Sequence, residues 1–505
     1  MDVDFHYYAT FAAARLAGWD KKEAETIAYS AQFVDEFDMR YGSSSEPWSF
    51  TTSQLPSPKM GTFRFDQINH QNGSSKIRPR RTVQNTTECI KSLHVRKDIW
   101  IPFHFLPGNY GKKSERDPRH IKREGCSNKN FDLLCRPFSP LAIAMINDLL
   151  EFNKNHDGSN YDYLLQLVGL RMHVFADTWA HQDFVGDGVQ AINDCLGYYN
   201  FIEKGECLEQ LNWAFNPFKD DLNMGYAPNV QLSRAYLGHG RLGHFPDYSW
   251  CRYYYSPAWM QAGGSINPNS NANNAKMLVR DNPVVFQTAF FEIVKVLYAL
   301  KNKIPTYPNR ITLPLIFGTN KVDVITNAVR EAITLDRSED LYTDTLVFQK
   351  TVDKWKELIK DHCGGIDITF DNQKWKQEAI PALTNASRTT GEYQWDHGKF
   401  IKTNLYKFNL AAEHHFAFVK TRLRTDLKYE LDDIATFDKS KVGLSTEVVW
   451  QPDSSVSKCP ICNKSFGTFF RKHHCRTCGR VVCSGCAPEK RLRGDRICKT
   501  CESSM

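Results

Sequence analysis

Three features of the sequence predict a mainly α-helical protein that ends in a small, metal-stabilised finger. Apolar residues recur at helical spacing along much of residues 1–431. Residues 432–449 lack sustained periodicity and are expected to form a linker. Four CxxC pairs then follow between Cys459 and Cys501. We therefore expect a large helical domain at 1–431, the linker at 432–449 and a finger at 450–505.

Capping and apolar patterns locate the individual helices. Asp20 and Glu23 form a capping box, which opens a helix that reaches Val34. Further helices are expected at 141–152, 161–181, 284–301, 351–359 and 401–423. Residues 51–130 and 263–274 are rich in polar residues and are expected to form surface loops.

Composition and charge narrow the class of protein. With 41% hydrophobic residues among 505, the chain can form a large globular core. No apolar run approaches the length needed to cross a bilayer, and the N-terminus lacks the basic and apolar regions of a secretory signal. Outside the CxxC pairs the cysteines are single and odd in number, which fits a reducing compartment. We expect a soluble protein of the cytosolic type.

The CxxC pairs predict two closed tetrahedral zinc sites, because eight thiolates supply four ligands to each ion. A segment this short cannot bury enough apolar surface to fold alone, so the zinc is expected to be structural. The predicted ligands are Cys459, Cys462, Cys475, Cys478, Cys483, Cys486, Cys498 and Cys501.

Positive charge is confined to this cysteine-rich end. Residues 458–505 hold eleven Lys or Arg against three acidic residues, whereas the whole chain has a net charge of +7. The preceding residues are therefore close to neutral. A basic patch on a small finger predicts an anionic partner, with nucleic acid as the rival of a membrane surface.

Three short motifs surround the cysteines and resemble the signatures of the FYVE zinc finger. Trp450 and Asp453 form a WxxD pattern, residues 471–476 read RKHHCR, and residues 496–498 read RIC. The resemblance implies binding of phosphatidylinositol 3-phosphate on endosomal membranes. The alternative is an RNA- or protein-binding zinc ribbon, which needs neither the WxxD pattern nor exposed phenylalanines.

Phosphate recognition favours Arg in fork geometry together with protonatable His, and adjacent aromatic residues on a short turn favour insertion into lipid. On this basis the turn at Thr468 and Phe469, with Phe470, is expected to enter the bilayer. The predicted lipid-binding residues are Trp450, Asp453, Thr468, Phe469, Phe470, Arg471, Lys472, His473, His474, Arg476 and Arg496.

A second chemical signal lies in an apolar helix of the first domain. His173, Asp177 and His181 are spaced four apart and share one stripe of that helix. Burying three ionisable groups without partners costs several kcal/mol, and a divalent cation would compensate two imidazoles and a carboxylate. A hydrogen-bonded triad within the core is the alternative.

Other segments offer further ligands. Asp4 and His6 lie at the start of the chain, and Asp35 lies at the end of the helix that Asp20 caps. Residues 238–247, GHGRLGHFPD, form a glycine-rich loop of the kind that approaches metals or phosphates. Turn capping is the alternative role for its two histidines. The candidates from this loop are His239, His244 and Asp247.

The segments DFHYYATFAAARLAG, RMHVFADTWAHQDFVG and GHGRLGHFPD together resemble a family of uncharacterised, mainly bacterial proteins, from Met1 to about Leu423. That family is distantly similar to zinc-dependent phospholipase C and P1 nuclease. The similarity implies an all-helical domain with one to three zinc ions, in which His173 and Asp177 match an HxxxD pair. The sequence departs from that group in two ways, since it has no obvious second HxxxE element and lacks the N-terminal tryptophan whose amine is a ligand. Asp4 and His6 are the candidates to replace that amine.

The resulting hypothesis is a metal-dependent phosphoester hydrolase acting on phospholipid or another phosphoester, with Asp35 and Asp177 bridging or positioning a metal-activated water. The alternatives are a non-catalytic membrane adaptor with a structural helical domain, and a P1-like nuclease. The near-neutral helical domain argues against the nuclease. A bacterial-type domain joined to a reader of a eukaryotic lipid points to a protein peripheral on endosomes, either a bacterial effector secreted into a host or a protist protein.

Overall fold

The protein is described by a computed structural model. The described residues are 1–37, 40–41, 61–62, 68–70, 73–75, 80, 82–84, 97–110, 131–155, 163–199, 202–203, 206–207, 211–212, 237–242, 244–260, 278–334, 344–387, 392–395, 397–431, 453, 456–467, 470–475, 480–488 and 498–499.

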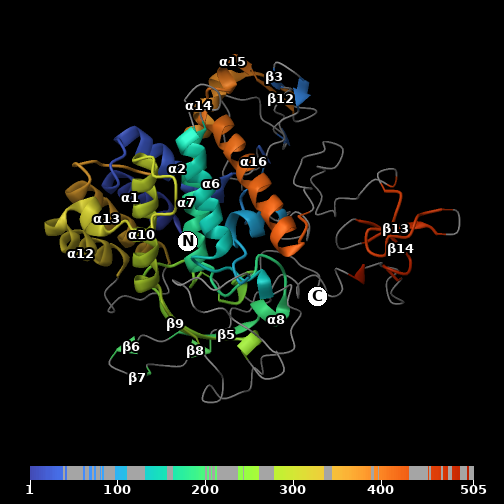
Figure 1. Cartoon of the computed structure of the whole chain (residues 1–505), viewed down its shortest axis with the longest axis horizontal. Coiled ribbons are helices and arrows are strands. Elements are labelled where there is room, and N and C mark those ends of the chain that lie inside the picture. The colour runs from blue at the N-terminus through green and yellow to red at the C-terminus, as the bar shows by residue number, and fades with distance from the viewer. Residues whose placement is uncertain are drawn as a thin grey trace.

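Helices dominate the described chain (Figure 1). The α-helices are α1 (Thr10–Leu16), α2 (Lys21–Glu36), α6 (Pro140–Asn155), α7 (Leu164–Ala180), α8 (Gln190–Asn193), α10 (Asn282–Lys301), α11 (Leu313–Phe317), α12 (Val322–Ile333), α13 (Asp344–His362), α14 (Lys374–Ala379), α15 (His397–Phe400) and α16 (Asn404–Arg422). The π-helical turns are η1 (Asp4–Ala9), η2 (Trp100–His104) and η10 (Leu423–Leu427), and the 3-10 turns are η4 (Gly240–Leu242), η5 (Ala258–Met260), η8 (Thr319–Lys321) and η9 (Ile380–Ala382).

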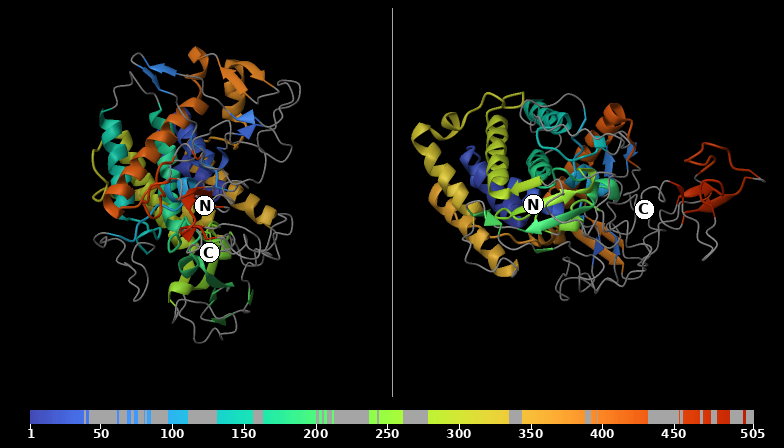
Figure 2. Two further views of the ribbon diagram at one scale, coloured as in Figure 1. Left: turned by 90° about the vertical axis from the view of Figure 1, so that its right-hand side faces the viewer. Right: turned by 90° about the horizontal axis from the view of Figure 1, so that it is seen from below.

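The strands are short and antiparallel. They are β1 (Arg40–Tyr41), β2 (Gly61–Thr62), β3 (Ile68–His70), β4 (Gly73–Ser75), β5 (Cys195–Tyr199), β6 (Ile202–Glu203), β7 (Glu206–Cys207), β8 (Leu211–Asn212), β9 (Arg252–Pro257), β10 (Leu278–Asp281), β11 (Leu383–Ser387), β12 (Glu392–Trp395), β13 (Lys472–His474) and β14 (Val481–Cys483). One sheet has four strands in the order β10-β9-β5-β8, and the others have two. The four-stranded sheet lies below the helices in Figure 1 and in the left panel of Figure 2.

Helix α7 is the centre of the helical domain. It packs against α2, α6, α10, α16 and η2, and the residues from Gln166 to its end are buried. An element surrounded on all sides must be apolar on nearly every face, and the sequence of α7 has this character. Its few ionisable residues therefore lie inside the protein.

The closest helix crossing joins α7 to α2. A Cβ added at Gly169 would lie 2.1 Å from the carbonyl oxygen of Ile27, so a side chain does not fit there. Ser30 on α2 donates a hydrogen bond of 2.6 Å to the carbonyl of Gln166. Glycine thus lets the two backbones touch, and the residues that follow along both helices, Asp35 and His173, come to face each other.

The structure confirms the predicted fold class, with a mostly helical N-terminal region and a cysteine-rich finger. Both hydrogen bonds of the predicted capping box are present, Glu23 N to Asp20 Oδ1 at 2.8 Å and Asp20 N to Glu23 Oε2 at 3.1 Å. Helices α6, α7, α10, α13 and α16 occupy the remaining predicted positions. The four-stranded sheet was not predicted, since its strands are separated by long segments of sequence.

The surface loop predicted for 51–130 is wrong for residues 97–110. Ile101, Phe103, Phe105 and Leu106 are buried there, and η2 packs against α7 and α16. The polar composition of the surrounding stretch concealed this apolar run. The predicted loop at 263–274 and the predicted linker at 432–449 lie outside the described residues.

By length and composition, one helix in the described chain, α10, is apolar enough to cross a membrane, contrary to the expectation that no run approaches that length. Its most apolar window is 61% buried inside the protein. It packs against α1, α7 and α12 and carries the buried residue Glu292. These contacts are those of a core helix, which satisfies the same length and composition criteria.

Gly169→Ala is expected to lower the stability of the helical domain. Overpacking a tight contact costs about 1–3 kcal/mol, which outweighs the gain of about 1 kcal/mol from replacing a helical glycine by alanine. The midpoint of thermal or urea unfolding measures the effect. Stability that is unchanged or higher than that of the wild type would contradict the close α2–α7 contact.

Candidate functional site

The candidate site is a buried cluster of histidines and aspartates at the centre of the helical domain. The described residues form three neighbouring groups, two of which share His173, and the possible ligand atoms within each group lie within 4.8 Å of one another. The groups are His6, Asp35 and His173; His104, His173 and Asp177; and His181, His239 and Asp247.

Asp177, on the inner face of α7, connects the groups. Its Oδ2 lies 3.1 Å from His173 Nε2 and 3.4 Å from His104 Nδ1, and its Oδ1 lies 3.1 Å from His6 Nε2. The amino group of Met1 donates to Asp177 Oδ1 at 2.9 Å and to Asp247 Oδ1 at 3.0 Å. A single carboxylate thus faces nitrogens from several segments of the chain.

The orientation of His104 is set by backbone contacts. Its Nε2 lies 2.8 Å from the carbonyl oxygen of Thr82, which only accepts hydrogen bonds, so Nε2 carries the proton. The Thr82 hydroxyl in turn donates to the carbonyl of Val34 on α2 at 2.7 Å. Nδ1 of His104 therefore faces Asp177, Asp35 Oδ1 at 3.7 Å and His173 Nε2 at 3.3 Å.

His181 is arranged in the same way. Its Nδ1 donates to the carbonyl oxygen of His104 at 2.6 Å, and its Nε2 lies 3.0 Å from Asp247 Oδ1. His239 Nε2 lies 3.3 Å from the other oxygen of Asp247. In the neutral form of His181 a lone pair faces a carboxylate, an arrangement that is stable only with a cation between them or a proton on the ring.

Burial sets the charge states of several groups. It lowers the pKa of His6 to about 4 and holds the pKa of His173 well below its ordinary value, so both rings are neutral near pH 7. Burial raises the pKa of Asp35 well above its ordinary value, and the charge of Asp177 adds to this. Burial would also raise the pKa of Asp177, but the nearby His181 and Met1 amine hold it well below its ordinary value.

Some buried polar atoms of the cluster make no hydrogen bond within the described structure. They are both ring nitrogens of His6, Nδ1 of His173 and Oδ2 of Asp177. Buried polar groups are normally satisfied, and imidazole nitrogens with carboxylate oxygens are the donor set of zinc and related divalent ions. The residues present therefore fit a bound metal cluster.

A buried ion-pair network holds the chain just after His181. Asp183 has a positive φ of 79° and pairs with both Arg136 and Arg280. Its Oδ2 also accepts a hydrogen bond of 2.7 Å from Tyr255 on β9. The four-stranded sheet thus anchors the turn that positions His181, and partners of this kind orient metal-ligating side chains.

The structure brings together most of the predicted helical-domain ligands and leaves two apart. Asp4 is buried and accepts a hydrogen bond of 3.1 Å from Ser249, while burial raises the pKa of Asp4 to about 6. His244 is exposed and stacks on Tyr248. Neither residue belongs to the three groups.

Sequence reasoning missed His104 and the Met1 amine. His104 stands alone within the apolar run Ile99–Leu106, and a single histidine in such a run was a detectable signal. The Met1 amino group lies beside Asp177, where the sequence analysis expected Asp4 and His6 to act as ligands. Of these two residues, the structure places only His6 in the cluster.

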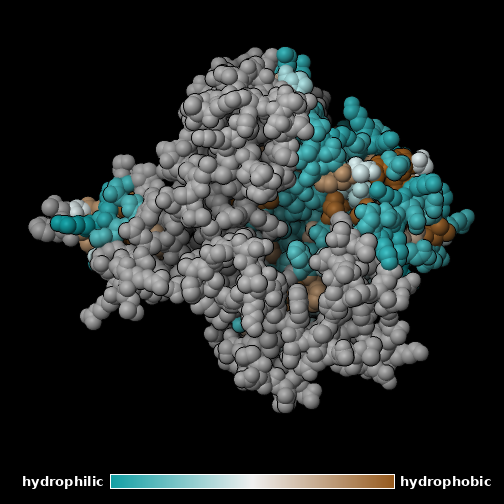
Figure 3. Space-filling model, turned by 180° about the vertical axis from the view of Figure 1, so that it is seen from behind, coloured by the Kyte–Doolittle hydropathy of each residue, from teal (hydrophilic) through white to brown (hydrophobic). Residues whose placement is uncertain are grey.

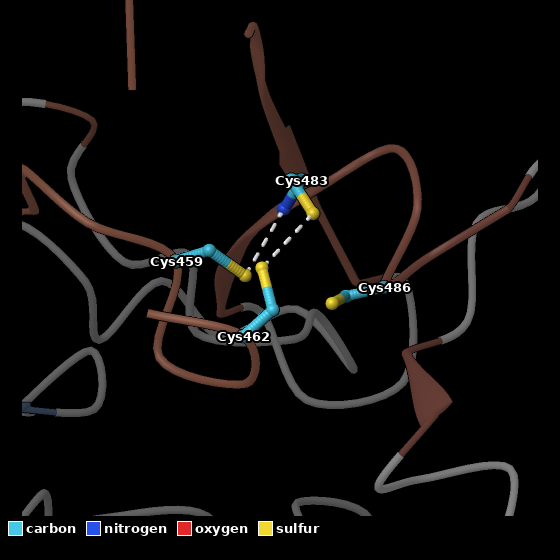
Figure 4. A group of neighbouring side chains, drawn as sticks. All are labelled: Cys459, Cys462, Cys483 and Cys486. Atoms are coloured by element: carbon cyan, nitrogen blue, oxygen red, sulfur yellow. Dashed lines mark hydrogen bonds between the residues drawn. The ribbon is translucent and has the colours of Figure 1, made fainter. Parts of the chain in front are cut away.

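The finger holds a second type of metal site (Figure 4). The sulfurs of Cys459, Cys462, Cys483 and Cys486 point towards one another and lie within 4.8 Å. Cys462 Sγ and Cys483 Sγ are 3.7 Å apart, close to the separation of about 3.8 Å that a tetrahedron with Zn–S bonds of about 2.3 Å requires. The first and third CxxC pairs therefore supply this site.

Backbone amides favour the thiolate form that zinc requires. Cys483 N donates to Cys459 Sγ at 3.5 Å, and Cys498 N donates to Cys475 Sγ at 3.2 Å. Burial opposes ionisation of Cys459, but the amides of Cys462 and Cys483 bring its pKa to about 6. Cys478 and Cys501, the remaining predicted ligands of the second site, lie outside the described residues.

The basic motif lies on the β13–β14 hairpin. His474 Nε2 is 3.7 Å from Asp453 Oδ1, and Lys472 donates to the Asp453 carbonyl, so the WxxD aspartate lies beside the motif. Arg471 is exposed, and His473 is half-buried. Trp450, Thr468, Phe469, Arg476 and Arg496 lie outside the described residues.

Phe470 is half-buried and packs against Phe466 in the core of the finger, with ring centroids 6.1 Å apart. The sequence-based expectation placed it in the bilayer with Phe469. Its contacts here are those of a core residue that supports the turn.

Comparison with known proteins identifies two regions. The model of a family of unknown function, DUF6765, matches residues 1–423, and the FYVE zinc finger model matches residues 449–505. The predicted FYVE finger and the predicted uncharacterised family are thereby confirmed. The comparisons with known families and proteins show no resemblance to phospholipase C or P1 nuclease, and no solved structure matches the chain.

Curated relatives share only short segments with this chain. Protein FREE1 of Arabidopsis thaliana is 42% identical over 63 residues, 11% of this chain and 10% of its own length. The human RUN and FYVE domain-containing protein 2 is 31% identical over 86 residues, 16% of this chain and 14% of its own length. The human FYVE, RhoGEF and PH domain-containing protein 6 is 30% identical over 92 residues, 17% of this chain and 6% of its own length. The chain thus covers a small part of each of these relatives.

Cys483→Ser is expected to reduce the zinc content of the full chain and to unfold the finger, since zinc supplies the folding free energy of such small units. Mass spectrometry of metals and limited proteolysis of the C-terminal region measure both effects. The control is Cys363→Ser, which changes a buried cysteine in the turn that follows α13 and should retain the wild-type zinc content. Equal zinc content in both variants would exclude Cys483 as a ligand.

Proposed function

Because this chain belongs to the DUF6765 family of unknown function and ends in a FYVE zinc finger, we propose that it is a metalloprotein recruited to endosomal membranes. In this proposal the finger binds phosphatidylinositol 3-phosphate, and the helical domain holds one to three metal ions and hydrolyses a phosphoester, phospholipid being the first candidate. The observation that carries the catalytic part is the set of three His/Asp groups. Two of them share His173, and the Met1 amine, which donates to both Asp177 and Asp247, links the second group to the third.

Lipid recognition by the finger is supported by the basic residues at the β13–β14 hairpin. Arg471 is exposed and directly precedes β13, which carries Lys472 and the two histidines. The last 48 residues are strongly basic in an otherwise near-neutral chain. Arginine binds phosphate oxygens through paired N–H donors, and a basic surface is attracted to anionic lipid. A peripheral position on endosomes follows from this recognition.

Metal binding in the helical domain is supported by the balance of charge. The Met1 ammonium group donates to Asp177 and Asp247. Asp35 faces His6 and His173, whose lowered pKa values keep both rings neutral near pH 7. Carboxylates packed this closely in a dry site require more positive charge than the amine provides. Divalent ions would supply it and would use the lone pairs of His104 and His181.

The same geometry supports hydrolysis. Metals bound at such a site lower the pKa of a bound water and stabilise negative charge on phosphoryl oxygens. Asp35 is 21% exposed, whereas Asp177 is almost completely buried, so Asp35 is the carboxylate that reaches the open side of the cluster. In this proposal Asp177 would help to hold the metal ions, and Asp35 would orient the water.

A membrane adaptor with a structural metal cluster is the second candidate, supported by the completeness of the hydrogen-bonded scaffold around His104 and His181. Hydrolysis assays of the full chain on phospholipid and nucleotide panels, with and without chelator, separate the two functions. They also test a P1-like nuclease, against which the near-neutral charge outside the finger argues.

Arg471→Ala is expected to weaken binding to vesicles containing phosphatidylinositol 3-phosphate by at least about tenfold, because hydrogen bonds to charged groups contribute about 1.5–3 kcal/mol each. Vesicle co-sedimentation measures the affinity. Lys458→Ala removes the same charge outside the RKHHCR motif and is the control. Equal losses in the two variants would show that charge alone, and no specific phosphate contact, drives binding.

Asp177→Asn is expected to lower the metal content of the full chain below that of the wild type and to abolish any phosphoester hydrolysis. Loss of a group that merely supports a ligand reduces metal affinity about 10–100-fold, and loss of a direct ligand should cost more. His104→Ala should act in the same direction. Metal mass spectrometry and the shift of the unfolding temperature on adding zinc provide two readouts.

The matched control is His244→Ala, since this exposed histidine lies outside the cluster. Metal content and hydrolysis should remain those of the wild type. The hydrolase proposal is refuted if the wild-type chain holds only the metal of its finger and its helical domain is not stabilised by zinc. The adaptor function would then be the remaining candidate.

A further inference from the structure

The short helix α11 presents apolar side chains to solvent. None of its five residues, Leu-Pro-Leu-Ile-Phe, is buried, and Leu315 is 61% exposed. Ile316 and Phe317 are half-buried against the main core, where Phe317 contacts Phe291 of α10. The helix is therefore held to the domain by one side while Leu315 projects outward. Single exposed apolar side chains are common on protein surfaces, so the residues around Leu315 decide whether it belongs to an interaction surface.

The next turns extend this surface. Gly318, with a φ of 78°, ends α11 and leads through η8 into α12, where Val324 is 51% exposed. We call Leu315, Val324 and the half-buried Leu313 the α11 patch. Figure 3 shows apolar side chains among polar ones on the side of the molecule formed by α12 and α13, on the right in that view.

Exposed basic residues flank the α11 patch along the chain. Lys303, Arg310 and Lys321 are exposed in the segment that leads to and from α11, and Asp323 is the acidic residue there. An apolar projection with a basic rim is the pattern of a surface that enters the headgroup region of an anionic bilayer. The charge of the rim is complementary to the lipid surface that the finger is proposed to recognise.

From these observations we propose that the α11 patch is a second membrane-contact site. It inserts Leu315 between anionic lipids while the finger binds the headgroup of phosphatidylinositol 3-phosphate. This inference rests on the proposed recruitment by the finger. Because both contacts belong to one chain, the second binding event is intramolecular, and even a weak insertion raises the overall affinity of the chain for the membrane. They also fix the orientation of the helical domain on the bilayer, which a single flexible attachment does not.

The test compares full-length variants on vesicles of phosphatidylcholine and phosphatidylserine containing phosphatidylinositol 3-phosphate. Leu315→Glu should weaken vesicle binding about tenfold, the factor expected for one apolar side chain that leaves the lipid. Binding of the soluble headgroup, inositol 1,3-bisphosphate, should be unchanged. Val279→Glu, at a valine of β10 that is 57% exposed, is the matched control and should bind vesicles as the wild type does.

Vesicle binding by Leu315→Glu equal to that of the wild type overturns the proposal. If this variant also changes the oligomeric state in sedimentation, a second copy of the chain covers the α11 patch instead. If the wild type does not bind the soluble headgroup, only the proposed function of the finger is refuted. In that case Leu315→Trp on phosphatidylserine vesicles still decides: quenching by brominated lipid beyond that of the wild type supports insertion, and no added quenching overturns it.

Discussion

Direct backbone contact between α2 and α7 is the constraint on which the rest of the helical domain depends. Gly169 removes the side chain that would separate the helices, and Ser30 bonds across the contact. Further along the same two helices, Asp35 Oδ1 and His173 Nε2 lie 3.9 Å apart. The end of α2 also holds Thr82, which fixes the His104 ring. A site of buried ionisable groups needs such rigid support, because a small displacement would leave charges unpaired in a medium of low dielectric constant.

The two parts of the chain obtain their metal sites by opposite routes. The finger has a core of cysteines and a few small apolar residues, so its fold depends on the ions that the thiolates bind. The helical domain has a large apolar core that positions its histidines through hydrogen bonds to backbone carbonyls, as at Thr82 and His104. Its candidate ligands are therefore held in place by packing, and a metal ion would bind to a fold that exists already.

Separation of charge along the chain supports a division of labour. The basic residues of the finger are available for an anionic surface, whereas the residues before the finger are nearly neutral in net charge. Two of their buried carboxylates, those of Asp177 and Asp247, accept hydrogen bonds from the Met1 amine. Inward-facing carboxylates that are paired in this way do not oppose the approach of the finger to an anionic membrane. Recruitment and metal chemistry can thus be altered independently by substitution.

The sequence by itself determined the features that depend on residues close together in the chain. The capping box of α2, the helical stripe of His173, Asp177 and His181, and the CxxC pairs all follow from local spacing, because helix period and metal-ligand spacing act over a few residues. Only the tertiary structure decided which distant groups join that stripe. It added His104 and the Met1 amine, directed Asp4 to Ser249 and left His244 in solvent. These outcomes depend on the path of the chain across the α2–α7 contact and on η2, whose apolar run lies within a polar stretch, and no local pattern encodes such a path.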